Sequence, residues 1–132
     1  GLAAGEFILR RGLGAFRKAE DDALRGFTAG PAAVVALGGG IYPSGRRRAF
    51  FRRAGVTVWL RRPLAEMLRL ARREGGRPLL TRKTAEAAAR LFARREKYYR
   101  LCDLEVTAAG LAPGEAAAKI RRSLEKSGFI PS

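Results

Sequence analysis

The stretch "VVALGGGI", Val34 to Ile41, runs from apolar residues directly into three consecutive glycines. A short apolar run without polar alternation is typical of a buried parallel strand, so "AVVAL" (33–37) is predicted to form one. In an open parallel sheet, ligands bind where the strands end. The position of Gly38, Gly39 and Gly40 therefore indicates either a tight turn or a place where a ligand approaches the backbone closely.

Strand-like and helix-like segments alternate along the rest of the chain. Two more short strands are predicted at "VTVWL" (56–60) and "LEVTA" (104–108). Apolar spacing, with Pro at expected starts and Gly at expected ends, predicts helices over 13–27, 43–55, 63–74, 84–101 and 113–128. This alternation predicts a single α/β domain over residues 1–132, with three α/β/α layers and a parallel sheet.

The chain is strongly basic, with 27 Lys and Arg against 12 Asp and Glu and a formal net charge of +15. Such a balance favours anionic partners, which include nucleic acid, anionic membranes and small phosphorylated or carboxylated molecules. Most of the arginines occur as pairs or in one triplet, spread along the whole chain as on solvated helix faces. An arginine-rich nucleic-acid surface is therefore kept as an alternative, but it is not favoured.

The composition excludes several classes of site. The only cysteine, Cys102, rules out an internal disulfide and fits a reducing compartment. Because the chain has no histidine, neither a His/Cys zinc site nor a histidine-based catalytic triad can form. No apolar run reaches the roughly 18 residues that span a bilayer, and the first residues do not resemble a signal peptide. We therefore predict a cytoplasmic protein without a membrane partner.

Several cationic side chains are candidates for a binding site. Arg17 and Glu20 in "AFRKAE" (15–20) are three residues apart, so they share a helix face and can pair. The pair is either an ordinary surface contact or a device that holds the guanidinium in place for a ligand carboxylate. Arg77 lies in a loop that interrupts the helical pattern, and Arg94 lies in "ARREKYYR". Both could join such a site.

Taken together, "GAFRKAE", "LGGGI", "RPLL" and "RREKYY…CD" resemble the shikimate kinase family in their order and spacing, from Gly1 to about Lys126. The resemblance implies a P-loop kinase-like α/β fold. It also implies transfer of the ATP γ-phosphate to the 3-hydroxyl of shikimate, with Mg2+, in aromatic amino-acid biosynthesis. It divides the chain into a substrate-binding region (about 1–55), a lid (about 73–84) and a C-terminal strand and helix (about 102–127).

The resemblance assigns the carboxylate and ring contacts of shikimate to particular residues. Arg17 and Arg94 match the arginines that bind the carboxylate, and Glu20 matches the acid that orients Arg17. Gly39 and Gly40 match the glycines whose backbone meets the ring.

The remaining roles follow from the same resemblance. Arg77 matches the lid arginine, which contacts ATP and acts catalytically on the transferring phosphate. Phe16 and Ile8 fall where the family lines its substrate pocket with apolar side chains. The loop around Pro113 falls where the family contacts adenine, although this match is weak.

One motif of the family is absent from these residues. The sequence contains no G-x-x-x-x-G-K-[ST], and "GGGIYPSGRRR" lacks both its lysine and its spacing. The phosphate loop, the ligands of ATP and Mg2+, and the family's first two strands would all precede Gly1. We therefore expect the 132 residues alone to be inactive, which leaves a non-catalytic ligand-sensing domain as an alternative. We also expect self-association, or complementation by another chain, at a vacant strand position between 33–37 and 56–60.

Overall fold

The computed structural model describes residues 3–28, 30–41, 45–74 and 85–131. Its elements follow in the order α1 (Ala4–Thr28), α2 (Gly45–Ala54), β1 (Val58–Arg61), α3 (Leu64–Glu74), α5 (Ala85–Tyr99), β2 (Leu104–Thr107) and α6 (Pro113–Lys126). The predicted helix start at Pro43 and Ser44 lies outside the described residues. So do Arg77 and most of the expected lid.

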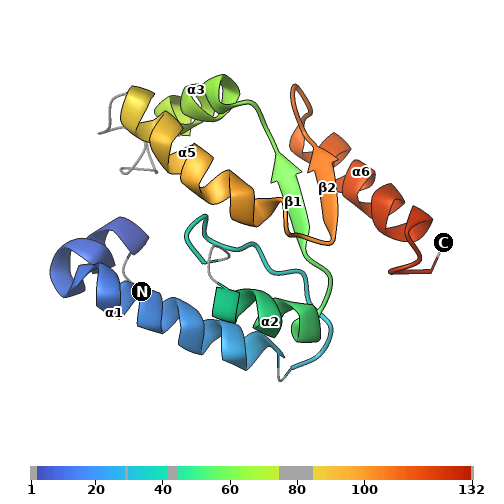
Figure 1. Cartoon of the computed structure of the whole chain (residues 1–132), viewed down its shortest axis with the longest axis horizontal. Helices are drawn as coiled ribbons and strands as arrows, with labels where there is room; N and C mark the ends of the chain where they lie inside the picture. Colours follow the sequence, from blue (N-terminus) through green and yellow to red (C-terminus); the bar gives the residue numbers. More distant parts are fainter. Residues whose placement is uncertain (1–2, 29, 42–44, 75–84, 132) are drawn as a thin grey trace.

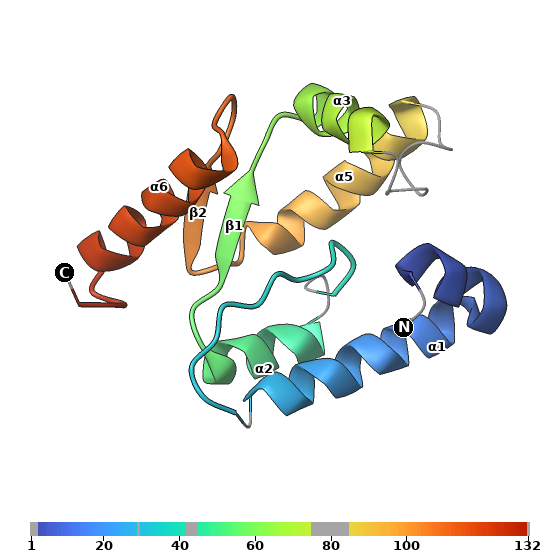
Figure 2. The same ribbon diagram turned by 180° about the vertical axis from the view of Figure 1, so that it is seen from behind.

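The strands β1 and β2 form a parallel pair, in register from Val58 opposite Leu104 to Arg61 opposite Thr107. The chain between them passes through α3 and α5, because a parallel pair needs a crossover rather than a hairpin. In both views α6 lies on one side of the strands, whereas α3 and α5 lie on the other (Figures 1 and 2). The predicted α/β class and the strands near 56–60 and 104–108 are confirmed.

The predicted strand at 33–37 is wrong. Residues 33–38 have no regular secondary structure, and in the described part of the chain the sheet contains only β1 and β2. Val34 is 104% exposed and Val35 is 39% exposed. A strand needs a neighbour to pair its backbone groups and a surface that covers its side chains, and this segment has no ladder partner among the described residues. Self-association or complementation at a vacant strand position between 33–37 and 56–60 stays a prediction.

Local sequence signals explain the helix ends. The helix α1 is broken at Gly12, whose φ of 80° and ψ of 162° are not helical, so its second part begins where a helix was predicted. Pro113 starts α6, and the Glu115 side chain accepts a hydrogen bond from the Ala112 amide at 2.7 Å. Gly128, with φ of 72°, follows the end of α6 as predicted. No helix within the described ranges is both long and apolar enough to cross a membrane.

A small core joins the helices α1 and α2 to the loop that contains the glycines. Three residues are buried against one another: Leu24 of α1, Ile41 of the loop and Phe51 of α2. Leu37 and Tyr99 pack at the edge of this cluster. Burying a side chain of this size contributes about 1.5–3 kcal/mol to folding. Ile41 therefore fixes the end of the glycine segment to α1 and α2.

Candidate functional site

Gly38, Gly39, Gly40 and Ile41 form a turn, called here the glycine turn. The Ile41 amide donates a hydrogen bond to the Gly38 carbonyl oxygen at 3.0 Å, which closes the turn. The loop that carries it passes between α5 on one side and the neighbouring helices α1 and α2 on the other (Figures 1 and 2). The turn is thus presented to side chains from three helices.

The first of these contacts comes from α1. The Arg17 guanidinium donates to the Glu20 carboxylate in an ion pair whose side chains are only 26% and 13% exposed. A Cβ on Gly40 would lie 2.0 Å from Arg17 Nη2, and a Cβ on Gly38 would lie 2.8 Å from Glu20 Oε1. The pair therefore lies directly on the backbone of the turn, and glycine is required for this close approach.

A second set of contacts comes from α5, from residues that were not among the predicted site residues. The Tyr99 hydroxyl donates a hydrogen bond to the Gly39 carbonyl oxygen. Arg95 Nη1 lies 3.3 Å from the position that a Cβ on Gly39 would take. Burial raises the pKa of Tyr99, and the nearby charges of Arg95 and Arg17 offset part of this rise. Tyr99 is therefore a protonated donor at neutral pH.

The sequence did contain a signal for this second set. Arg95 and Tyr99 are four residues apart in α5, so they share a helix face. The resemblance to the family instead selected Arg94, which lies on the neighbouring face of the same helix. A third helix also contributes, because Arg47 of α2 donates to carbonyl oxygens of the turn.

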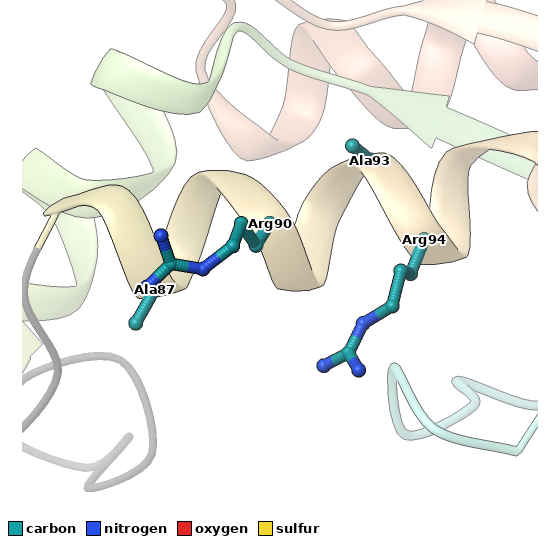
Figure 3. A pocket seen from close by; sticks show the side chains of 4 residues that line it. All are labelled: Ala87, Arg90, Ala93 and Arg94. Carbon is teal, nitrogen blue, oxygen red and sulfur yellow. The ribbon is translucent and has the colours of Figure 1, made fainter.

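Arg94 is placed differently from Arg17. It is exposed on α5 and lines a shallow pocket together with Ala87, Arg90 and Ala93. Its side chain extends away from the helix toward the loop of residues 30–41 (Figure 3). Within the described residues it has no ion pair or hydrogen bond, while Arg90 has a loose contact of 3.8 Å with Glu86. The structure thus leaves the Arg94 guanidinium available to an anion but does not join it to the turn.

The expected pocket-lining residues lie on the two parts of α1. The Phe16 ring has the Arg17 guanidinium carbon 5.8 Å from its centre and the Phe7 ring at 6.1 Å. Ile8 is half-buried and precedes the break at Gly12. Phe16 is therefore beside the guanidinium expected to bind substrate, whereas the role of Ile8 stays a prediction.

Pro113, expected near adenine, follows a loop that is fastened to α3. Arg62 Nη2 donates to the Leu111 carbonyl oxygen at 3.0 Å, and the Gly110 amide lies 3.3 Å from both oxygens of Glu66. Arg62 and Glu66 also pair with each other. These contacts position the loop at the carboxyl end of β2, where ligands bind in parallel sheets.

The residues present do not provide a complete set of phosphate and metal ligands. The sequence lacks the G-x-x-x-x-G-K-[ST] motif, whose backbone amides and lysine hold phosphates. Across residues 3–28, 30–41, 45–74 and 85–131, no three Cys, Asp or Glu side chains are grouped as a metal site. Arg77 is outside the described residues. No described residue is therefore assigned to Mg2+ or to the phosphates of ATP.

Comparison with known proteins identifies relatives along nearly the whole chain. The family described as "Shikimate kinase" matches residues 1–125. A shikimate kinase of Geobacter metallireducens is 33% identical over 126 residues, which are 95% of this chain and 70% of that protein. A shikimate kinase 2 of Escherichia fergusonii is 33% identical over 129 residues, or 95% and 71% of the two chains. A shikimate kinase of Nitratidesulfovibrio vulgaris is 43% identical over 96 residues, which are 70% of this chain and 55% of that protein. No solved structure matches significantly.

Proposed function

Because this chain belongs to the shikimate kinase family, we propose that it binds shikimate at the glycine turn for phosphorylation of the 3-hydroxyl by ATP. The reaction belongs to aromatic amino-acid biosynthesis, and we propose that it takes place in the cytoplasm. Within the chain, residues of about 1–55 would hold the substrate. The regions of about 73–84 and 102–127 would serve the nucleotide side.

The observation that carries this proposal is the Arg17–Glu20 pair lying against Gly40. A guanidinium held by a carboxylate keeps its remaining N–H groups in a fixed plane, which suits a ligand carboxylate. The half-buried position of the pair strengthens such a contact compared with an exposed one. Gly39 and Gly40 would meet the hydroxylated ring on the side of the turn that Arg17 and Arg95 do not occupy.

Arg94 would supply a second cation for the carboxylate. Its lack of a partner within the described residues supports this role, because a new ion pair would not displace a contact with any of them. The net charge of +15 would also raise the local concentration of an anionic substrate. Arg94→Ala should weaken binding more than Arg90→Ala, which serves as the matched control one helical turn away.

On the nucleotide side, we propose that Arg77 stabilises the negative charge of the transferring phosphoryl group. The Pro113 loop would lie against adenine, with Arg62 and Glu66 holding it in place. ATP supplies the phosphoryl group when bound, and Mg2+ neutralises part of its charge. The contribution of this chain would be to position the acceptor and to supply cationic side chains.

The proposal is tested by titrating the chain with shikimate and with shikimate methyl ester in a calorimeter. Both share the ring, but only shikimate has the anionic carboxylate that Arg17 and Arg94 would bind. Shikimate should bind at least about tenfold more tightly, because charge-assisted hydrogen bonds are stronger than neutral ones. Equal affinities, or no binding of either compound, would contradict the proposal.

A second candidate, a shikimate-binding domain without catalysis, would need only the Arg17–Glu20 pair at the glycine turn. ADP release from MgATP, with and without shikimate, separates the two. Shikimate-dependent release that Arg17→Ala abolishes would support kinase activity in this chain. Binding of shikimate without release would support the second candidate. The arginine-rich nucleic-acid surface stays an untested alternative.

A further inference from the structure

Arg47 of α2 joins the glycine turn to α1. Its Nη1 atom donates to the Ile41 carbonyl oxygen at 3.1 Å and approaches the Gly40 carbonyl oxygen at 3.4 Å. Its Nη2 atom donates to Asp21 Oδ2 at 2.9 Å. The Arg47 and Asp21 side chains are 24% and 38% exposed, so water screens this pair less than a fully exposed one.

The two arginines that contact Gly40 are anchored to adjacent residues of α1. Glu20 holds Arg17, and the next residue, Asp21, holds Arg47. Arg17 lies where a side chain on Gly40 would be, whereas Arg47 lies at its carbonyl oxygen. The position of the Gly40 peptide is therefore set relative to Arg17 by a single helical turn of α1.

We propose that Asp21 and Arg47 are positioning residues for shikimate, an inference that rests on the proposed function. Three consecutive glycines have many accessible conformations, so ordering them costs more conformational entropy than ordering other residues. A turn that is already held before the ligand arrives avoids this cost at binding. Arg47 would act through the backbone of the turn and would not itself touch the ligand.

The test is a shikimate titration of the full chain carrying Arg47→Ala, Arg47→Lys or Asp21→Asn. Arg47→Ala should weaken binding about tenfold, because it removes charged hydrogen bonds that hold the site. Arg47→Lys should recover part of this loss, since lysine keeps the charge but not the fork of donors. Titrations are made well below the melting temperature of each variant, so that a loss of folded protein does not contribute.

Two matched controls separate positioning from general destabilisation. Asp22→Asn removes the exposed pair between Lys18 and Asp22, one residue further along α1. Arg53→Ala removes an exposed arginine from the same helix as Arg47. Neither should change shikimate affinity. Hydrogen exchange of residues 38–41 should become faster in Arg47→Ala and Asp21→Asn but not in the controls.

A double substitution completes the test. If Arg47 acts through its contact with Asp21, combining Arg47→Ala with Asp21→Asn should add little to the loss caused by Arg47→Ala alone. Unchanged affinity and exchange in Arg47→Ala would overturn the inference, as would an equal loss in Asp22→Asn. A wild-type chain that does not bind shikimate would contradict the proposed function, whereas a binding wild type with unaffected variants would contradict this inference alone.

Discussion

The glycine turn and the β1–β2 pair are held in place by different means. The two strands are joined by a backbone ladder and covered on one side by α6, whose Ala116 is buried. The turn has one internal backbone hydrogen bond, and its other contacts come from side chains of α1, α2 and α5. Apart from the packing of Ile41 against Leu24 and Phe51, most of these side chains are arginines or their acidic partners.

This difference separates stability from function within one small chain. Substitutions in the strand pair should change the free energy of unfolding, because they remove buried apolar contacts. Substitutions around the turn should change ligand affinity, because they move charged groups that the fold does not need for its core.

The largest effect is expected from Gly40→Ala. The new Cβ would lie 2.0 Å from Nη2 and 2.5 Å from Cζ of Arg17, so the guanidinium must leave its position. Shikimate affinity should fall about 30-fold or more, as expected when one partner of a hydrogen-bonded charge pair is lost. The fold should tolerate the change because only a flexible side chain moves. Calorimetric titration measures the loss.

Gly114→Ala is the control for this substitution. Nothing lies within 4 Å of the position that a Cβ on Gly114 would take. Its shikimate affinity should equal that of the wild type. If Gly40→Ala also binds like the wild type, Arg17 does not act from the position seen here.

Val106→Ala tests the strand pair. Val106 is 2% exposed and pairs with Leu60 across the ladder. Losing its buried methyl groups should lower the free energy of unfolding by about 2 kcal/mol, as measured by urea denaturation. Val34→Ala, at a residue that is 104% exposed, should change it by less than about 0.5 kcal/mol. Similar losses in both variants would contradict the unpaired state of residues 33–37.

Tyr99→Phe removes one donor from the turn and keeps the ring, whose centre lies 5.9 Å from that of Trp59. Shikimate affinity should fall about fivefold, corresponding to one hydrogen bond. Tyr98→Phe changes the neighbouring hydroxyl, and its ring is instead packed beneath Lys97 at 5.1 Å. A loss of equal size in both variants would show that the hydroxyl of Tyr99 has no particular role.

The smallest effect is expected at Asp103, which accepts hydrogen bonds from Thr57 N at 2.7 Å and Thr57 Oγ1 at 2.6 Å. Burial alone would raise the pKa of Asp103, but these hydrogen bonds and the charge of Arg52 outweigh it and lower the pKa. Because the pKa is lower in the folded protein, the ionised Asp103 carboxylate stabilises the fold at pH values above its unfolded pKa of about 3.9. This stabilisation is lost as the pH falls through the folded pKa.

At pH 7, Asp103→Asn should therefore have a lower melting temperature than the wild type. Below the folded pKa of Asp103, the two proteins should melt at nearly the same temperature. The expected loss is at most about 1 kcal/mol, because the carboxylate is exposed and screened by solvent. Asp22→Asn provides a second exposed carboxylate for comparison. A constant difference between wild type and Asp103→Asn at every pH would contradict this account.

Much of the fold could be predicted because its signals are local. Pro63 and Pro113 stand at helix starts, and the apolar runs at 56–60 and 104–108 overlap the observed strands. The strand at 33–37 failed for a physical reason. Its apolar pattern indicates that the segment is suited to burial. A strand also needs a neighbouring strand to pair with, and the local sequence pattern does not show whether one is present.

The site could be predicted only in part. Arg17 and Glu20 are close in sequence, so their pairing could be predicted from their spacing. The three glycines likewise indicated a place where another group lies close to the backbone. Tyr99 reaches Gly39 across 60 positions of the chain, and Arg47 reaches Asp21 across 26. Such contacts depend on how the helices pack, which periodicity does not specify.

The most direct test of the account is a comparison of Arg17→Ala with Lys18→Ala in a shikimate titration. Both remove a cation from the same stretch of α1, but Lys18 pairs only with exposed Asp22 in the contacts described above, whereas Arg17 lies on the glycine turn. We expect Arg17→Ala to weaken binding at least about 30-fold and Lys18→Ala to bind like the wild type. Equal affinity of Arg17→Ala and the wild type would contradict the proposal that the glycine turn and Arg17 form the substrate site.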